Sequence, residues 1–80
     1  MTFNLDTYIF IGNTYTFVCQ RSGVTKTLKI VDETYDMMKN KYTYTVEENY
    51  HGTHTYTIKH IDLIIELQRL ERSKHWKQQC

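Results

Sequence analysis

Three neighbouring histidines are the residues of this sequence whose type and spacing come nearest to a metal site. His51 and His54 form an H-x-x-H pair, and His60 follows them. Structural zinc sites usually combine two closely spaced ligand pairs, and a second pair is missing here. The spacing therefore favours solvent-exposed loop histidines, and the sequence predicts no metal and no other cofactor.

Carboxylates and hydroxyls offer little more for catalysis. Asp32, Glu33 and Asp36 lie close enough in sequence to act as an acid–base pair or to hold a divalent cation. The same residue types are typical of the first turn of a helix, which is the favoured interpretation. Ser22 and Ser73 have no histidine and acid arranged around them in a triad pattern. The sequence predicts that the protein is not an enzyme.

Threonines and lysines form the first candidate binding surface. Period-two alternation in the predicted strands places Thr45, Thr57, Lys29 and Lys59 on one side of a sheet. Their hydroxyl and ammonium groups can donate hydrogen bonds to phosphate or sugar oxygens. A solvent-facing strand surface is the favoured interpretation, because threonine is common at such positions. Nucleic-acid or nucleotide binding is therefore the alternative function rather than the leading one.

A second candidate surface lies near the C-terminus, where cations and an aromatic ring occur together. It comprises Arg69, Arg72, Lys74 and Trp76. An indole ring can stack on a base or anchor in a protein pocket, whereas cations in the last turns of a helix also offset the helix dipole. Because ten basic and nine acidic residues leave a net charge of +1, no global field attracts polyanions.

Apolar residues on the reverse side of the first strands form the third candidate surface. Ile9, Ile11, Val18 and Val31 alternate with the aromatic residues that the predicted core uses. A contiguous apolar area of roughly a few hundred Å² is seldom left bare. The sequence therefore predicts a cover, which is the C-terminal helix, a curled sheet, a second copy of the chain or another protein.

The elements that position these residues follow from turn signals between runs of alternating residues. Strands are predicted at Thr7–Ile11 and Thr14–Gln20, joined by Gly12-Asn13 in a two-residue turn. Ser22-Gly23 forms the next two-residue turn and leads into a third strand. These three strands are expected to pair in sequence order.

The two turns also predict which side chains share the core face. Pairing across the first turn brings Tyr8 and Phe10 to the same face as Tyr15 and Phe17. Pairing across the second turn sets Phe17 opposite Leu28. Both turns therefore place the aromatic residues on one side of the sheet.

The second half of the chain contains a helical segment and a further hairpin. Asp32–Asn40 breaks the alternation and predicts one or two helical turns. Lys41–Asn49 and Thr53–His60 then pair as two strands, with Gly52 in the left-handed position of a three-residue loop. This loop length places the tyrosines of the hairpin on the core side and its threonines on the reverse side.

A C-terminal amphipathic helix is predicted from Asp62, which can cap it, to about Gln78. Its apolar stripe at helical spacing comprises Leu63, Ile64, Leu67 and Leu70. Of the two cysteines, Cys19 is expected to behave as a small buried hydrophobic residue and Cys80 as an exposed thiol. Pairing between them is not expected.

These elements predict an α+β fold over one domain, residues 1–80. It comprises a five-stranded antiparallel meander that can curl into a half-barrel, a short helical excursion before the fourth strand, and the C-terminal helix. The longest apolar run is three residues, so neither secretion nor a membrane segment is expected.

Composition completes the functional prediction. The chain has no Ala and no Pro but twelve Thr and seven Tyr, which indicates a low-GC genome and fits a phage or mobile element as well as a low-GC bacterium. A coherent fold with a surplus apolar face and no catalytic constellation favours binding. We therefore expect a small binding protein that inhibits a host-defence protein stoichiometrically, in the manner of anti-CRISPR proteins, in the bacterial cytoplasm. A homodimer is the other predicted use of the apolar face.

Overall fold

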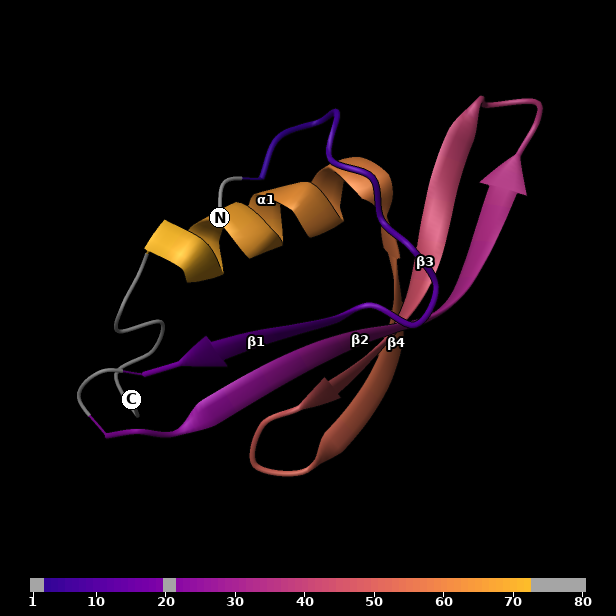
Figure 1. Ribbon diagram of the computed structural model, residues 1–80. Coiled ribbons are helices and arrows are strands. Elements are labelled where there is room, and N and C mark those ends of the chain that lie inside the picture. Colours follow the sequence, from indigo (N-terminus) through magenta and orange to yellow (C-terminus); the bar gives the residue numbers. More distant parts are fainter. Residues whose placement is uncertain (1–2, 20–21, 73–80) are drawn as a thin grey trace.

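Four strands and one helix make up the fold. The computed structural model describes residues 3–19 and 22–72. In sequence order, β1 (Thr14–Val18), β2 (Thr25–Asp36), β3 (Lys41–Asn49) and β4 (Thr53–Lys59) form one antiparallel sheet. α1 (His60–Arg72) follows β4 directly and lies across one face of this sheet (Figure 1). The predicted α+β meander is confirmed, but the described residues contain four strands rather than five.

The core lies between the sheet and α1. Apolar side chains of the sheet that alternate along the strands are buried, and they meet the apolar stripe of the helix. The main buried residues are Phe17, Leu28, Ile30, Tyr44, Val46, Leu63, Ile64, Leu67 and Leu70. The predicted helical stripe is therefore confirmed. In the described part of the chain, no helix is long and apolar enough to cross a membrane.

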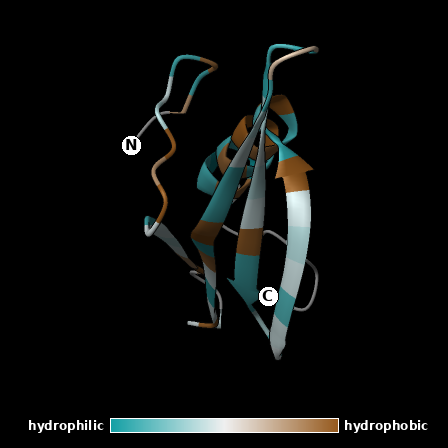
Figure 2. Ribbon diagram, turned by 90° about the vertical axis from the view of Figure 1, so that its right-hand side faces the viewer, coloured by the Kyte–Doolittle hydropathy of each residue, from teal (hydrophilic) through white to brown (hydrophobic). Residues whose placement is uncertain are grey.

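The N-terminal segment is not the predicted first strand. Residues 3–13 run alongside the sheet rather than within it (Figure 2). Gly12 N–H donates to Ile30 O at 2.7 Å, and Ile30 N–H donates to Asn13 O at 2.9 Å. Because Gly12 and Asn13 already bond to β2, they continue the line of β1 and cannot close a two-residue hairpin. The chain before them crosses to the helix, where Gln68 Nε2 donates to Phe3 O at 2.7 Å.

This path reverses the predicted burial of three residues of the segment. Ile9 is only 2% exposed and belongs to the core, whereas Tyr8 and Phe10 are exposed and their ring centroids lie 4.2 Å apart. The prediction that Ile9 lies on a bare reverse face was wrong. Ile11 is 59% exposed, as expected for that face.

The predicted helical excursion at Asp32–Asn40 was also wrong. β2 continues to Asp36, a turn follows, and β3 begins at Lys41. Asp36 Oδ1 accepts the backbone N–H of Met38 at 3.0 Å and of Lys39 at 3.2 Å. A helix N-cap makes the same kind of hydrogen bond, so this sequence signal serves a helix start and a tight turn equally well.

A β-bulge at Val31 changes the alternation of β2. Ile30 is opposite Val46, but Asp32 is opposite Thr45, so β2 carries one extra residue at this point. One inserted residue moves every later side chain of the strand to the other face. Beyond the bulge, the end of β2, the turn and the start of β3 extend as a two-stranded hairpin beside α1 (Figure 1). We call this hairpin, residues 32–43, the arm.

The hairpin of β3 and β4 has the predicted register. Val46 is opposite Tyr56, and Thr45 is opposite Thr57. Gly52 has φ of +119°, which confirms its left-handed role in the loop. Since β1 and β4 are the two ends of the strand order, the sheet is open and the predicted curling finds no support in strand pairing.

The register of β1 and β2 differs from the prediction by two residues. Phe17 is opposite Lys26 rather than Leu28. The cause is a longer connection, since Cys19 N–H donates to Val24 O at 2.8 Å and closes the loop there. A shift of two leaves the core face unchanged, but it places Lys26 beside Phe17 with only 2% of the lysine exposed.

The remaining predictions concern the cysteines and the helix ends. Cys19 is completely buried, as predicted, but it is disulfide-bonded, so the prediction that it stays unpaired was wrong. Cys80 lies outside the described residues. The helix begins at His60, two residues before the predicted cap, and its predicted continuation to Gln78 also lies outside the described residues beyond Arg72.

Candidate functional site

The predicted threonine and lysine surface exists as one face of the sheet. Because Tyr44 and Val46 point into the core, the residues between them point away from α1, and we call this side the open face. Thr45 and Thr57 lie opposite each other on it, and Lys59 lies opposite Thr43. Strand pairing therefore brings these predicted residues together.

Carboxylates interrupt the positive charge of the open face. Glu47 is directly opposite Lys29, and Asp32 is directly opposite Thr45. Opposite charges at facing positions of an antiparallel pair attract each other, and the field they present outward is weakened. The open face is polar and hydroxylated, but it is not a basic surface.

The predicted basic end of the helix lies on the other layer of the fold. Arg69 donates from Nε to Glu66 Oε2 at 3.2 Å and from Nη2 to Glu66 Oε1 at 2.5 Å. This two-point hydrogen bond raises the pKa of Arg69 and holds its guanidinium against the helix. Arg72 is exposed nearby, whereas Lys74 and Trp76 lie outside the described residues.

The third predicted surface is only partly present. Ile11, Val18 and Val31 are exposed as expected, but Ile9 is in the core. The predicted apolar area therefore loses one of its four members to the inside of the protein.

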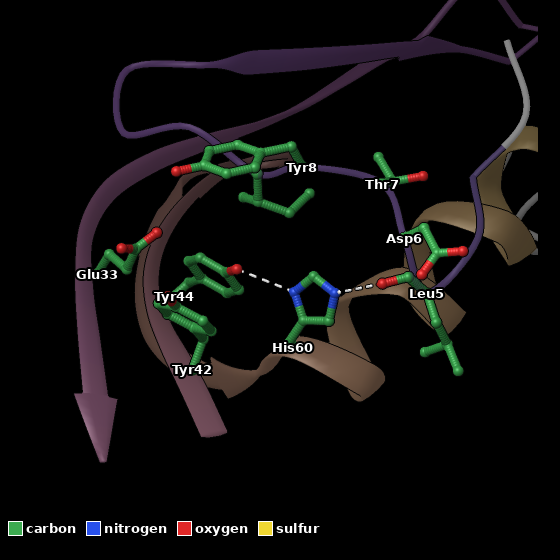
Figure 3. A pocket seen from close by; sticks show the side chains of 9 residues that line it. Leu5, Asp6, Thr7, Tyr8, Glu33, Tyr42, Tyr44 and His60 are labelled. Atoms are coloured by element: carbon green, nitrogen blue, oxygen red, sulfur yellow. Dashed lines mark hydrogen bonds between the residues drawn. The ribbon is translucent and has the colours of Figure 1, made fainter. Parts of the chain in front are cut away.

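A cavity between the N-terminal segment and the base of the arm was not predicted. It has a volume of about 300 Å³. Figure 3 shows aromatic rings and carboxylates around it, with His60 between the strands and the N-terminal segment. Its main lining side chains are Asp6, Tyr8, Glu33, Tyr42, Tyr44 and His60.

His60 joins three parts of the fold at this cavity. Its Nε2 lies 3.1 Å from Leu5 O, and its Nδ1 lies 2.9 Å from the hydroxyl of Tyr44 (Figure 3). A carbonyl oxygen only accepts, so Nε2 carries the proton and donates to Leu5. In the neutral ring Nδ1 then accepts from Tyr44. Both ring nitrogens are therefore used in holding the N-terminal segment to β3 and α1.

The Tyr44 hydroxyl is held in its protonated form. Burial first, and then the negative charge of Glu33 directly opposite on β2, raises the pKa of Tyr44 to about 12. A phenol with this pKa is neutral at ordinary pH and donates a hydrogen bond instead of acting as a base or nucleophile. The pair of Tyr44 and His60 is therefore suited to positioning and recognition.

Comparisons with known proteins return no match, since no family model, no curated protein and no solved structure is significantly similar to the chain. Function is therefore inferred from the geometry of this chain. Among the residues that the structure describes, no three His, Cys, Asp or Glu side chains gather closely enough to hold a metal ion.

The arm carries the most exposed apolar side chains of the described chain. Met37 and Met38, in the turn at its end, are 83% and 97% exposed. Tyr35 and Tyr42 face each other across the arm with ring centroids 4.7 Å apart, and both are also exposed. An apolar surface at the end of a projecting hairpin is the kind that binds another protein.

Two features explain why sequence patterns missed these sites. The bulge at Val31 moved Glu33 to the same face as Tyr44, and no alternation rule locates such an insertion. The segment Thr7–Ile11 was assigned to the sheet, although it runs alongside it. One useful signal was present, because the predicted hairpin paired Thr53–His60 with Lys41–Asn49 and so ended with His60 beside the first tyrosines of that strand.

Proposed function

We propose that the protein is a non-enzymatic binding protein that occupies a site on a partner protein, with the arm as its main contact surface. The observation that carries this proposal is the exposure of Met37 and Met38 beside Tyr35 and Tyr42. Methionine is flexible and polarizable, so it adapts to different apolar partners, and tyrosine is enriched in protein interfaces.

The state of the polar groups supports binding over catalysis. The Tyr44 phenol is neutral, and both nitrogens of His60 are engaged in internal hydrogen bonds. The Arg69 guanidinium is held by Glu66. These three groups, which could act in acid–base or electrostatic catalysis, therefore already have a structural role.

The biological setting of the proposal comes from composition. A chain without Ala or Pro fits a low-GC genome, and short single-domain proteins of this kind are typical of phages and mobile elements. We propose a host-defence protein as the partner, blocked by stoichiometric binding in the bacterial cytoplasm, as anti-CRISPR proteins block their targets. A homodimer through the arm is the competing outcome.

Affinity capture followed by reconstitution tests the proposal. A host protein captured from lysate is purified and titrated by calorimetry, and we expect saturation at one copy of each chain. Met37→Ser with Met38→Ser should weaken binding at least tenfold, whereas Ile11→Ser, on the predicted apolar face, should leave it unchanged. Equal weakening by Ile11→Ser, or self-association without a partner in light scattering, would contradict this assignment.

Nucleic-acid binding is the second proposal and has less support. The open face offers hydroxyls and Lys59, but Glu47 and Asp32 lie among them. Binding through phosphates weakens steeply as salt rises. Fluorescence anisotropy with single-stranded DNA at low salt tests nucleic-acid binding by the original protein and by the variants Arg72→Glu and Lys59→Glu. Salt-sensitive binding that both changes abolish would favour this function over the first.

A further inference from the structure

The cavity beside the arm has aromatic walls on two sides. Tyr42 and Tyr44 of β3 lie nearly parallel, with ring centroids 6.4 Å apart and an angle of 11° between the planes. Tyr8, from the N-terminal segment, faces them across the cavity (Figure 3). The face of an aromatic ring carries negative electrostatic potential and attracts cations.

Two carboxylates line the same cavity and no lysine or arginine does. Glu33 is directly opposite Tyr44, and its carboxylate is drawn toward the tyrosine rings in Figure 3. Asp6 lines the other end, on the N-terminal segment. Within the described residues neither carboxylate takes part in an ion pair. Both ring nitrogens of His60 are already engaged by the Leu5 carbonyl and the Tyr44 hydroxyl.

We propose that this cavity binds an organic cation, an ammonium or guanidinium group held between Tyr8 and Tyr42 and facing Glu33. Aromatic rings together with a carboxylate form a cage that prefers a positive, partly apolar group over a hydrated metal ion. The volume of about 300 Å³ is ample for the end of a lysine or arginine side chain.

The source of the cation is a basic side chain of the partner protein. Tyr42 belongs both to the wall of the cavity and to the exposed surface of the arm. A partner that covers the arm therefore reaches the mouth of the cavity with its own side chains. This assignment of the source rests on the proposed function, whereas the preference for a cation rests on the cavity alone.

Nuclear magnetic resonance of the full chain tests the proposal with matched probes. The probes are choline, its neutral isostere 3,3-dimethylbutan-1-ol, and the N-acetyl methylamides of lysine and arginine. We expect choline and both amino-acid derivatives to shift the backbone signals of Tyr8, Tyr42 and His60 saturably. The neutral isostere should cause no saturable shift, because it has the shape of choline without its charge.

A pair of variants links binding to the cavity. Glu33→Gln should weaken choline binding about fivefold, because it removes the facing charge and keeps the size of the side chain. Glu47→Gln is the matched control, since Glu47 lies on the open face of the same sheet. Thermal melts of both variants establish that the fold is intact.

Four outcomes would overturn the inference or the assigned source of the cation. Equal binding of the neutral isostere would make the cavity a plain apolar site, and equal weakening by Glu47→Gln would place the cation elsewhere. Binding of choline without binding of the two amino-acid derivatives would overturn the assigned source. If a one-to-one partner complex forms but no probe binds, the cavity proposal fails while the binding function stands. If a probe binds but no partner complex forms, the binding function fails while the preference of the cavity for a cation stands.

Discussion

The hydroxyl of Tyr44 on β3 is hydrogen-bonded to Nδ1 of His60, the first residue of α1, over 2.9 Å. The opposite nitrogen of the same imidazole holds Leu5 O at 3.1 Å. One side chain therefore connects the sheet, the helix and a segment 55 residues earlier in the chain. This connection also shapes the wall of the cation cavity, so its loss should affect both stability and recognition.

Replacement of His60 should loosen the N-terminal segment. His60→Ala removes the partners of the Tyr44 hydroxyl and the Leu5 carbonyl, and we expect the free energy of unfolding to fall by about 1–3 kcal/mol. Hydrogen exchange should accelerate around Thr7 and Ile9. His54→Ala, at an exposed position of β4, is the control and should change neither quantity. Unchanged exchange in the N-terminal segment would show that His60 does not hold it.

Stability should decline at alkaline pH because of two tyrosines. Burial is the main cause that raises the pKa of Tyr44 and of Tyr56 from 10.0 to about 12. Below pH 10 both phenols keep their protons in the folded and unfolded states. Between pH 10 and 12 the unfolded chain loses these protons first, so the unfolding free energy should fall across this window.

Tyr56→Phe provides the comparison for that pH dependence. The variant lacks one of the two raised groups, so its unfolding free energy should decline less steeply between pH 10 and 12. Urea denaturation at several pH values measures the slope, and the ultraviolet absorbance of phenolate follows the titration. Identical slopes for the two proteins would contradict the prediction.

The buried ammonium of Lys26 should make its partner carboxylate important. Lys26 Nζ lies 3.5 Å from Glu48 Oε1 and 5.5 Å from the centre of the Tyr50 ring. Glu48→Gln removes a negative charge 3.5 Å from a buried cation and should cost about 1–3 kcal/mol of unfolding free energy.

Lys26→Met should cost less than Glu48→Gln, because it removes the buried charge together with its need for compensation. The two changes combined should cost less unfolding free energy than the sum of their separate costs, and a double-mutant cycle measures this difference. Glu47→Gln, one residue away but on the open face, is the control for the effect of a lost carboxylate. Additive costs in the cycle would refute the coupling.

Two isoleucines that sequence patterns treat alike should respond differently. Ile9 is 2% exposed, and Ile9→Ala should lower the unfolding free energy by about 2–4 kcal/mol. Ile11 is 59% exposed, and Ile11→Ala should stay within about 0.5 kcal/mol of the original protein. Chemical denaturation distinguishes the two, and similar costs would show that both side chains share one environment.

Local rules of the sequence determined the hairpin of β3 and β4 and the buried face of α1. The loop with Gly52 fixed the pairing of Tyr44 with Ile58, because the number of loop residues sets the register and the register sets the faces. The spacing of Leu63, Leu67 and the other members of the stripe fixed the helix face in the same way.

Only the tertiary structure decided the path of the N-terminal segment and the extension of β2. An aspartate caps a turn or a helix with the same kind of hydrogen bond, so Asp36 alone did not distinguish the two. The pairing of Tyr35 with Tyr42 across the arm selected the strand. Ile9 entered the core because the segment crosses to the helix, which no local pattern records. The bulge at Val31 then brought Glu33 opposite Tyr44. The candidate cation site exists through these long-range contacts, since its walls come from segments that meet only after the chain has folded.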